Sequence, residues 1–304
     1  MTTLSVVLSV FNEEKKLGKT LSAVSWADEI VVVDNTSTDR TVKIASGFKA
    51  KIYKRPNYPM LNTNKNYGIS QATGDWILYL DADEVVSQEL ATEVKRAISN
   101  QRDLNGFWIP RKNIIFGKWI RHGLWWPDKQ LRLFKHGSGR YPEKHVHEYI
   151  TLDGKSGELS EALIHYNYES VTQYLHKFIQ IYADNEAENL ASAQYRYSWY
   201  DAIRFPVSDF VKIYFAQKAY QDGLHGLVLS IFQAFYSFVV FTKLWERNAF
   251  REIDISPENV RAEINRSVGE IIYWNLTTAQ NHAQGFLAKL FWRLKRKFVR
   301  IRPQ

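Results

Sequence analysis

The sequence has no cysteine among its 304 residues. This absence excludes disulfide bonds, zinc–thiolate sites and cysteine nucleophiles, and it suits a reducing compartment. A basic segment ahead of the first apolar run, which a signal peptide needs, is also missing from MTTLSVVLSVFNEEKK. The two absences together predict a protein of the cytoplasm.

Acidic residues are absent from the last 19 residues, Phe286 to Gln304. Seven Lys and Arg residues in that segment account for nearly all of the net charge of +8, so the rest of the chain is close to neutral. Apolar residues at helical spacing predict a basic amphipathic helix over residues 286–302, a type that binds anionic membrane surfaces. An ordinary docking helix with a solvated charged face is the alternative. Nucleic acid is not expected as a partner, because no recognition module accompanies the tail.

A continuous apolar run of about 20 residues, long enough to span a bilayer, is also lacking. The longest run, residues 227–241, covers 15 residues and predicts a buried or interfacial helix. Ser170 is placed to cap a helix before it, and residues 254–284 are polar and predict a loop with a helix. The chain beyond residue 168 is therefore expected to be helical.

The first 100 residues show apolar runs that alternate with helical patterns. Strands are predicted at residues 3–10, 29–33, 51–53 and 76–80, and helices from Glu13 and at residues 40–46, 62–72 and 88–98. Such alternation is typical of an α/β protein with a parallel, doubly wound sheet. From Gly106 the strand patterns become less regular and indicate a mixed region.

Three acids follow the buried strand predicted at Trp76 to Leu80, namely Asp81, Asp83 and Glu84. Carboxylates this close repel one another, and a folded chain tolerates them when a cation such as Mg²⁺ or Mn²⁺ lies among them. The alternative is an acidic start to the next helix. The spacing alone leaves both interpretations open.

Polar residues also follow two other predicted strands, at Asn12-Glu13 and at Asp34-Asn35. Ligands of doubly wound sheets bind beyond the carboxyl ends of the strands. Three polar clusters at such ends favour a nucleotide site over a helix cap. A further cluster, Glu143 to Glu148, contains two His and two Glu, yet its HxHE pattern matches no zinc motif and also suits a polar loop.

Five segments in this order resemble glycosyltransferase family 2, and within it the branch of lipopolysaccharide core β-glucosyltransferases. They are SVVLSVFNEE, EIVVVDNTSTDRT, NKNYGISQATGDWILYLDADE, WWPDKQLRLF, and HVHE followed by LIHYNY. The resemblance implies a GT-A fold, a Rossmann-like nucleotide-diphospho-sugar transferase domain, over residues 1–168. Residues 169–304 are then a helical, membrane-associating region.

The resemblance also implies roles for residues at the strand ends. The donor nucleotide is expected to contact Phe11, Glu13, Asp34, Lys65, Asn66, Asp81 and Arg132, with Arg132 as a second cation on the diphosphate. Asn35 stands where many relatives have a second acid. Asp83 is the expected ligand of Mg²⁺ or Mn²⁺, with Asp81 in the water shell of the ion and His165 as a possible further ligand.

The family transfers a sugar with inversion, so one base on the acceptor side is sufficient. Glu148 is the first candidate for that base and Asp128 the second. His147 and His165 are candidates to orient the base or complete the metal shell, or are structural histidines. Trp125 and Trp126 are candidates to stack on the acceptor sugar, or are packed in a core.

The resulting hypothesis is a metal-dependent hexosyltransferase acting on the inner face of the cytoplasmic membrane. Its donor is expected to be a nucleotide sugar resembling UDP-glucose, and its acceptor a lipid-linked glycan such as lipopolysaccharide core. Two alternatives stay open: a polyprenyl phosphate as acceptor, or a non-catalytic, membrane-bound protein that binds nucleotide sugars.

Overall fold

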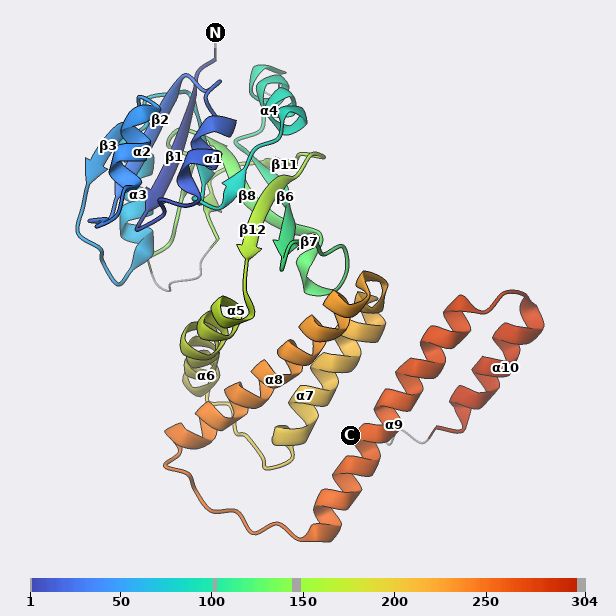
Figure 1. Cartoon of the computed structure of the whole chain (residues 1–304). Coiled ribbons are helices and arrows are strands. Elements are labelled where there is room, and N and C mark those ends of the chain that lie inside the picture. The colour runs from blue at the N-terminus through green and yellow to red at the C-terminus, as the bar shows by residue number, and fades with distance from the viewer. Residues whose placement is uncertain (1, 101–102, 144–148, 300–304) are drawn as a thin grey trace. The chain divides into compact units, whose positions relative to one another are not determined.

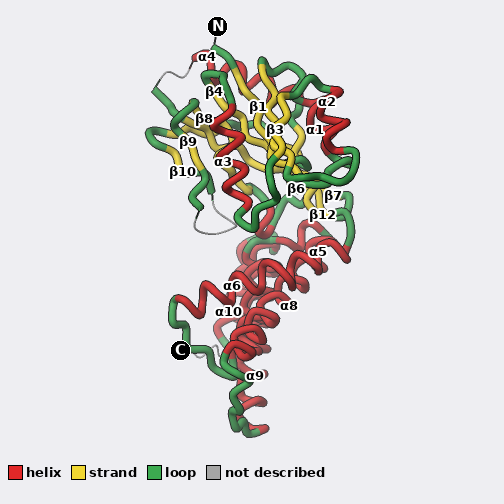
Figure 2. The backbone as a smooth tube through the Cα atoms, turned by 90° about the vertical axis from the view of Figure 1, so that its left-hand side faces the viewer, coloured by secondary structure: helices red, strands yellow, loops and turns green. Residues whose placement is uncertain are grey.

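A computed structural model describes residues 2–100, 103–143 and 149–299 of the chain. The chain divides into two compact units (Figure 1). The sheet unit consists of Met1–Ile115 and Trp126–Asn167, and the helical unit of Phe116–Trp125 and Tyr168–Gln304. Nearly all the strands belong to the first unit, whereas the second is built of helices (Figure 2).

A large mixed sheet forms the centre of the sheet unit. Its main strands are β1 Leu4–Val10, β2 Glu29–Asp34, β3 Lys51–Lys54, β4 Trp76–Leu80, β5 Glu84–Val85, β6 Gly106–Ile115, β8 Asp128–Lys135 and β12 Leu163–Tyr168, in the order β3-β2-β1-β4-β8-β6-β12-β5. The strands β3, β2, β1 and β4 are parallel, as predicted, and β8 and β6 continue the sheet in antiparallel pairing. Shorter strands are β7 Lys118–Trp119, β9 Gly139–Arg140, β10 Thr151–Leu152 and β11 Ser156–Glu158.

The central strands are buried on both faces because helices cover the sheet. Along β4, Leu78 and Leu80 belong to one apolar core, and Ile77 and Tyr79 belong to the other. This alternation follows from the two-residue period of a strand. The first core includes side chains of α1 Leu17–Ala23 and α4 Gln88–Asn100, and the second includes Ile69 of α3 Leu61–Gln71; α2 Thr41–Gly47 completes the set.

One helix begins later than the sequence predicts. The residues after Glu13 form a turn, and α1 starts at Leu17 with Lys16 at its N-cap. Glu14 accepts hydrogen bonds from the backbone and side chain of Arg40, just ahead of α2. Its carboxylate therefore stabilises the start of a different helix from the one that was expected.

The helical unit contains six α-helices among the described residues. They are α5 Val171–Lys177, α6 Ala183–Ser192, α7 Asp201–Val211, α8 Leu224–Arg247, α9 Pro257–His282 and α10 Phe286–Lys297, with π-helical turns at Phe178–Tyr182 and Lys212–Ala216 and 3-10 turns at Gly123–Trp125 and Ala219–Asp222. Ser170 caps α5 as predicted, because its side chain accepts a hydrogen bond from the backbone of Gln173. The polar stretch 254–284 was predicted as a loop with a helix, yet it is almost entirely α9.

The apolar run at 227–241 lies within α8, which is 24 residues long. By length and composition α8 is able to cross a membrane, with one third of its most apolar window buried in the protein. Taken alone, one such helix is weak evidence for a span, because core helices of soluble proteins meet the same criteria. The basic helix predicted over 286–302 begins at Phe286, and none of the residues of α10 is buried.

Candidate functional site

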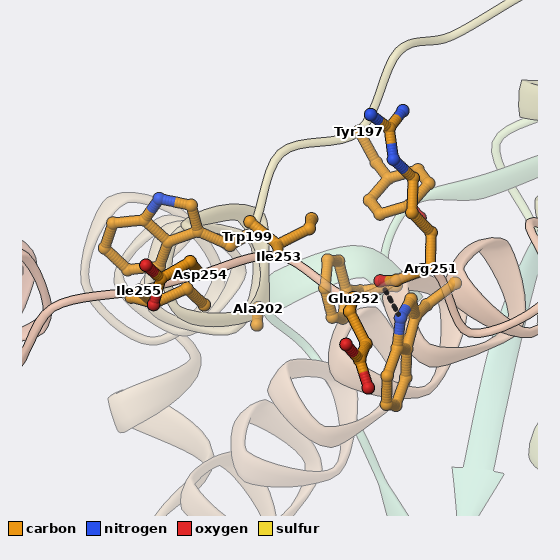
Figure 3. A pocket seen from close by; sticks show the side chains of 10 residues that line it. Tyr197, Trp199, Ala202, Arg251, Glu252, Ile253, Asp254 and Ile255 are labelled. Carbon is orange, nitrogen blue, oxygen red and sulfur yellow. Dashed lines mark hydrogen bonds between the residues drawn. The ribbon is translucent and has the colours of Figure 1, made fainter.

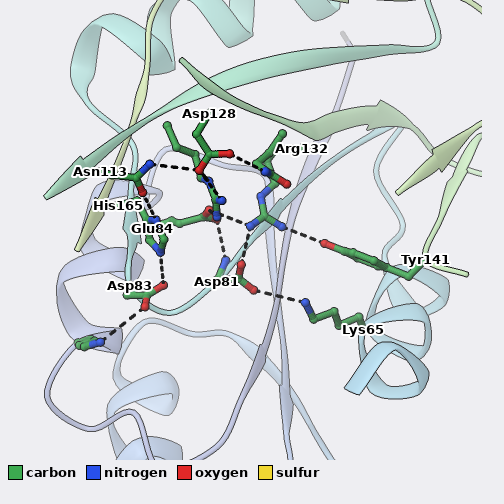
Figure 4. Close-up of polar contacts among 12 residues, drawn as sticks. Lys65, Asp81, Asp83, Glu84, Asn113, Asp128, Arg132, Tyr141 and His165 are labelled. Atoms are coloured by element: carbon green, nitrogen blue, oxygen red, sulfur yellow. Dashed lines mark hydrogen bonds and ion pairs between the residues drawn. The ribbon is translucent and has the colours of Figure 1, made fainter. Parts of the chain in front are cut away.

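The carboxyl ends of three parallel strands lie at one edge of the sheet. Val10 of β1 pairs with Asp34 of β2, and Leu8 of β1 pairs with Leu80 of β4. The polar residues that follow these strands are therefore neighbours, as the sequence predicts. The acids after β4 form the centre of a polar cluster (Figure 4).

Asp81 follows directly on β4 and lies between two cations. Its Oδ2 accepts a hydrogen bond of 2.5 Å from Arg132, and its Oδ1 lies 3.8 Å from Nζ of Lys65. Burial by itself raises the pKa of Asp81, but the charges of Arg132, Lys65 and Arg111 outweigh it and hold the pKa well below its usual range. Asp81 is therefore a carboxylate at neutral pH.

Glu84 is fully buried and holds the turn that contains Asp81 and Asp83. One of its oxygens accepts a hydrogen bond from the backbone N–H of Asp81 at 3.0 Å. Its other oxygen lies 2.8 Å from Arg132 and 3.4 Å from Arg111. Glu84 does not cap α4. The hydroxyl of Ser87 is at that position and accepts a hydrogen bond from the backbone N–H of Leu90. Its buried charge is balanced by the two arginines.

Asp83 faces a histidine on one side and a lysine on the other. Its Oδ1 lies 3.6 Å from Nε2 of His165, and its Oδ2 lies 3.6 Å from Nζ of Lys16. Burial lowers the pKa of His165 and so favours the neutral imidazole, although the negative charge of Asp83 acts in the opposite direction. The structure thus brings together Asp83 and His165, two of the three residues predicted at the metal, whereas the carboxylate of Asp81 contacts Arg132 and Lys65. Lys16 was not anticipated there.

A carboxylate oxygen suits both Mn²⁺ and Mg²⁺, whereas an imidazole nitrogen is a softer donor that suits a transition-metal ion such as Mn²⁺ better than Mg²⁺. Among the residues that the structure describes, no group of three His, Cys, Asp or Glu side chains is arranged to hold a metal. Mg²⁺ typically takes only one or two carboxylates from the protein and completes its shell with water and phosphate oxygens. The pair Asp83 and His165 fits an ion that is bound together with a phosphorylated substrate.

Asp128, the second candidate for the base, is held by three other side chains. It accepts hydrogen bonds from Arg111 at 2.6 and 2.9 Å, from Asn113 at 3.1 Å and from Gln130 at 2.9 Å. Burial raises its pKa, but the charge of Arg111 and these hydrogen bonds outweigh that and lower the pKa. A carboxylate so stabilised is a weak proton acceptor.

Arg111 and Asn113 belong to the polar cluster but were not among the site residues predicted from the sequence. Both lie on β6, and Arg111 is directly opposite Asp128 on β8. Two polar residues spaced by two in an apolar strand point to the same face, so GFWIPRKNII did carry a signal. That spacing indicates that the two side chains share a face of the strand, but it does not indicate that both bind Asp128.

Lys65 and Asn66 are neighbours on α3 but differ in what they contact. The ammonium of Lys65 lies 4.7 Å from the ring centre of Tyr141 and close to Asp81. The amide of Asn66 is bound by the backbone of Tyr141, donating to its carbonyl and accepting from its N–H, each at 2.9 Å. Lys65 is therefore directed to the acid cluster, whereas Asn66 anchors the chain at Tyr141. Arg132 is buried, and its guanidinium donates a hydrogen bond to the hydroxyl of the same Tyr141.

The residues expected around the base and ribose lie at the same edge. Asp34 is buried and accepts from the backbone N–H of Ser37 at 3.1 Å. Asn35, in place of a second acid, donates to Ser9 and accepts from Asn64 at 2.7 Å. Phe11 is 43% exposed, and Glu13 follows it at the end of β1.

Four predicted residues remain, of which the structure describes two. Trp125 is buried in the helical unit, and Trp126 is the first residue after the chain returns to the sheet unit. Glu148 and His147 lie outside the residues that the structure describes. Their expected roles as base and acceptor residue stay predictions.

A cavity of about 660 Å³ lies in the helical unit, at the C-terminal end of α8 (Figure 3). Its lining is rich in aromatic and aliphatic side chains, including Tyr197, Trp199, Phe241, Trp245 and Ile253. None of the acids of the polar cluster lines it. The carboxylates, the imidazole and the cations that could bind a substrate and a metal therefore belong to the polar cluster, whose acids do not line this cavity.

Comparison with known proteins gives a family match for the sheet unit. Residues 5–151 match the model described as Glycosyl transferase family 2. A glycosyltransferase of Rickettsia typhi is 27% identical over 277 residues, covering 87% of this chain and 92% of that protein. The lipopolysaccharide core biosynthesis glycosyltransferase LpsC of Rhizobium meliloti is 25% identical over 258 residues, covering 82% of this chain and 94% of LpsC.

Among solved structures, the crystal structure of residues 1–349 of TarS from S. aureus is similar in part. The alignment has a TM-score of 0.42 and 16% identity, and it covers 97% of this chain and 88% of that one.

Proposed function

From the match of residues 5–151 to glycosyl transferase family 2, we propose that this chain transfers a hexose from a nucleotide sugar to a hydroxyl of a lipid-linked glycan. The GT-A fold expected of that family is present in the sheet unit. A donor resembling UDP-glucose and an acceptor such as lipopolysaccharide core are the finer parts of this proposal. The name and coverage of LpsC support the acceptor class.

The observation that carries the proposal is the pairing of Asp81 and Asp83 with different partners at the end of β4. Asp81 is surrounded by the cations Lys65 and Arg132, whereas Asp83 faces His165. Asp83 and His165 would hold Mg²⁺ or Mn²⁺, which stabilises the negative charge of a departing diphosphate when it is bound. Lys65 supplies a further positive charge next to the same acids.

The acceptor hydroxyl requires a base, because displacement at the anomeric carbon releases its proton. Glu148 is the proposed base. Asp128 is a poorer candidate because Arg111 lies 2.6 Å from its carboxylate and stabilises the charged form. Lys65 and Arg132 keep Asp81 ionised near the donor, and Phe11, Glu13 and Asp34 are proposed to line the nucleotide.

The acceptor is proposed to lie in a membrane, which α10 would contact. Its basic residues include Lys295, Arg296 and Lys297, and its apolar residues Phe286, Leu287 and Phe291 are exposed. Basic amphipathic helices of this composition lie in the interface of anionic bilayers. The chain would thus act as a peripheral protein on the inner face of the cytoplasmic membrane.

A nucleotide-release screen tests the proposal. The purified chain is incubated with a panel of nucleotide sugars, with Mn²⁺, with Mg²⁺ or with a chelator, and with a lipid-linked glycan acceptor. Release of nucleoside diphosphate that requires one donor, the acceptor and a divalent ion is expected. Binding of a donor without any release, across the whole panel, would instead identify a non-catalytic nucleotide-sugar binder.

A further inference from the structure

The ring of His165 is held by a hydrogen bond that determines which of its nitrogens carries the proton. Its Nδ1 lies 2.6 Å from Oδ1 of Asn113, and both side chains are almost fully buried. An amide oxygen is only an acceptor, so Nδ1 must be the donor. The neutral ring then has its lone pair on Nε2.

The orientation of the Asn113 amide is itself determined by Asp128. The Nδ2 group of Asn113 donates to Oδ2 of Asp128 at 3.1 Å. A flipped amide would place its oxygen against the carboxylate and its NH₂ against the proton on Nδ1, losing both hydrogen bonds. The Oδ2 atom also accepts two hydrogen bonds from Arg111, so the carboxylate is fixed in charge and in position.

The Nε2 atom of His165 faces a second atom with lone pairs, Oδ1 of Asp83, at 3.6 Å. That separation is longer than a hydrogen bond. A carboxylate oxygen and an unprotonated imidazole nitrogen are both lone-pair donors, and they repel each other unless a cation or a hydrogen-bond donor lies between them. The geometry is therefore that of two ligands that point to one ion.

We infer that Asn113 is a positioning residue, which holds His165 as the Nδ1–H tautomer so that Nε2 is directed with Asp83 at a divalent cation, and that Arg111 and Asp128 orient Asn113 in turn. The inference rests on the metal site of the proposed function and assigns Asp128 a role other than proton transfer. The contacts run from Asp128 through Asn113 and His165 to Asp83 (Figure 4). Arg111 binds Asp128 at the start of this series. Outer partners of this type tune metal affinity by about 10- to 100-fold.

The tautomer is measured directly by long-range ¹H–¹⁵N correlation on protein labelled at its eight histidines. His165→Gln identifies the signals of His165. The wild type without metal is expected to show a protonated Nδ1 and an unprotonated Nε2. A ring that carries its proton on Nε2 would overturn the inference.

Metal binding is measured by calorimetric titration with Mn²⁺, once alone and once with UDP present, and in both cases without a donor sugar. Asn113→Leu keeps the volume of the side chain but removes its hydrogen bonds, and it is expected to weaken Mn²⁺ binding by about 10- to 100-fold. The exchange Asn113→Asp with Asp128→Asn retains an acceptor for Nδ1–H and one amide donor facing one carboxylate at the 113–128 contact, and it is expected to stay within about threefold of the wild type. Equal losses in the two variants would assign Asn113 a packing role, and an unchanged affinity in Asn113→Leu would also overturn the inference.

The matched control is Asn105→Leu, since Asn105 hydrogen-bonds to the backbone of Asp153, outside the polar cluster. Its Mn²⁺ affinity is expected to equal that of the wild type. The proposed function fails separately if the wild type binds no Mn²⁺ either alone or with UDP present. If the wild type binds Mn²⁺, Asp83→Asn does not, and Asn113→Leu binds normally, only the inference fails.

Discussion

The two units of this protein depart from the usual distribution of residues in opposite ways. The sheet unit buries charged and polar side chains, among them Glu84, Arg132, Asn113 and His165. The helical unit leaves large apolar side chains in contact with solvent, with Phe286 at 77% and Phe298 at 84% exposure. Buried polar groups and exposed apolar groups are the two informative exceptions to the rule that apolar residues lie inside.

Each exception has its own physical consequence. Buried charges are tolerated only when they are paired, and the pairing in the sheet unit brings two acids to the end of β4 with different partners. Exposed apolar side chains indicate a surface that another phase or molecule covers. We therefore propose that the sheet unit carries the chemistry and the helical unit the attachment, and each proposal has a separate test.

The largest effect is expected from Asp83→Asn, which removes the charge that faces His165. Transfer should fall by about 100- to 1,000-fold, because the amide is a poor ligand for a divalent ion. The measurement is nucleoside diphosphate release at saturating donor and acceptor. Asp153→Asn changes the same residue type in an exposed loop and should leave the rate unchanged. A rate for Asp83→Asn within tenfold of the wild type would remove the metal from the proposal.

A comparison of the two candidate bases is the next largest test. Glu148→Gln should retain donor binding and lower transfer by about 100-fold or more, since general bases contribute that much. Asp128→Asn should retain much more activity, because Arg111 already stabilises its negative charge. Donor affinity and transfer rate are measured for both variants. The reverse ranking would make Asp128 the base.

Deletion of residues 286–304 tests the helical unit. The shortened chain should lose most of its co-sedimentation with anionic vesicles, by at least about tenfold, because the deletion removes seven basic residues and each Lys or Arg near such a surface contributes about 1 kcal/mol. Its binding of nucleotide should not change. Replacement of Lys295, Arg296 and Lys297 by Gln is the matched variant and should weaken binding to anionic vesicles more than to neutral ones. Equal sedimentation before and after the deletion would contradict attachment through α10.

The smallest effect is expected from Lys16→Met. The ammonium of Lys16 lies 3.6 Å from Asp83 and repels a divalent ion that binds the same carboxylate. Its removal should strengthen Mn²⁺ binding by about threefold to tenfold, as measured by titration without donor. Lys19→Met is the control, because Lys19 is bound to the hydroxyl of Tyr166. Weaker binding in Lys16→Met would show that the ammonium supports the site.

Local sequence patterns were sufficient for most elements of the sheet unit. The four parallel strands and three of the four predicted helices begin and end within one or two residues of their expected positions. The exception is α1, where two glutamates suggested a helix start and Glu14 instead pairs with Arg40, 26 positions away. A long-range contact decided that case, and a local pattern contains no information about it.

The candidate site was only partly accessible from the sequence. Asp81 and Asp83 were accessible because they directly follow a buried strand. His165 was placed near a metal by resemblance alone, and its register opposite Glu84 on β5 explains why it reaches Asp83. Arg111 and Asn113 were missed because their partners come from other strands of the mixed half of the sheet.

The sequence by itself determined which residues are polar at the ends of apolar strands, the excess of positive charge at the C-terminus and the absence of cysteine. These are properties of the composition and of the spacing of apolar residues over short stretches of the chain. Only the tertiary structure decided that Asp128 binds Arg111, that Asn113 lies between Asp128 and His165, and that Lys16 faces Asp83. Those contacts join segments that are distant in the chain. They are selected together, because each buried polar group needs hydrogen-bond or charge partners from the other segments.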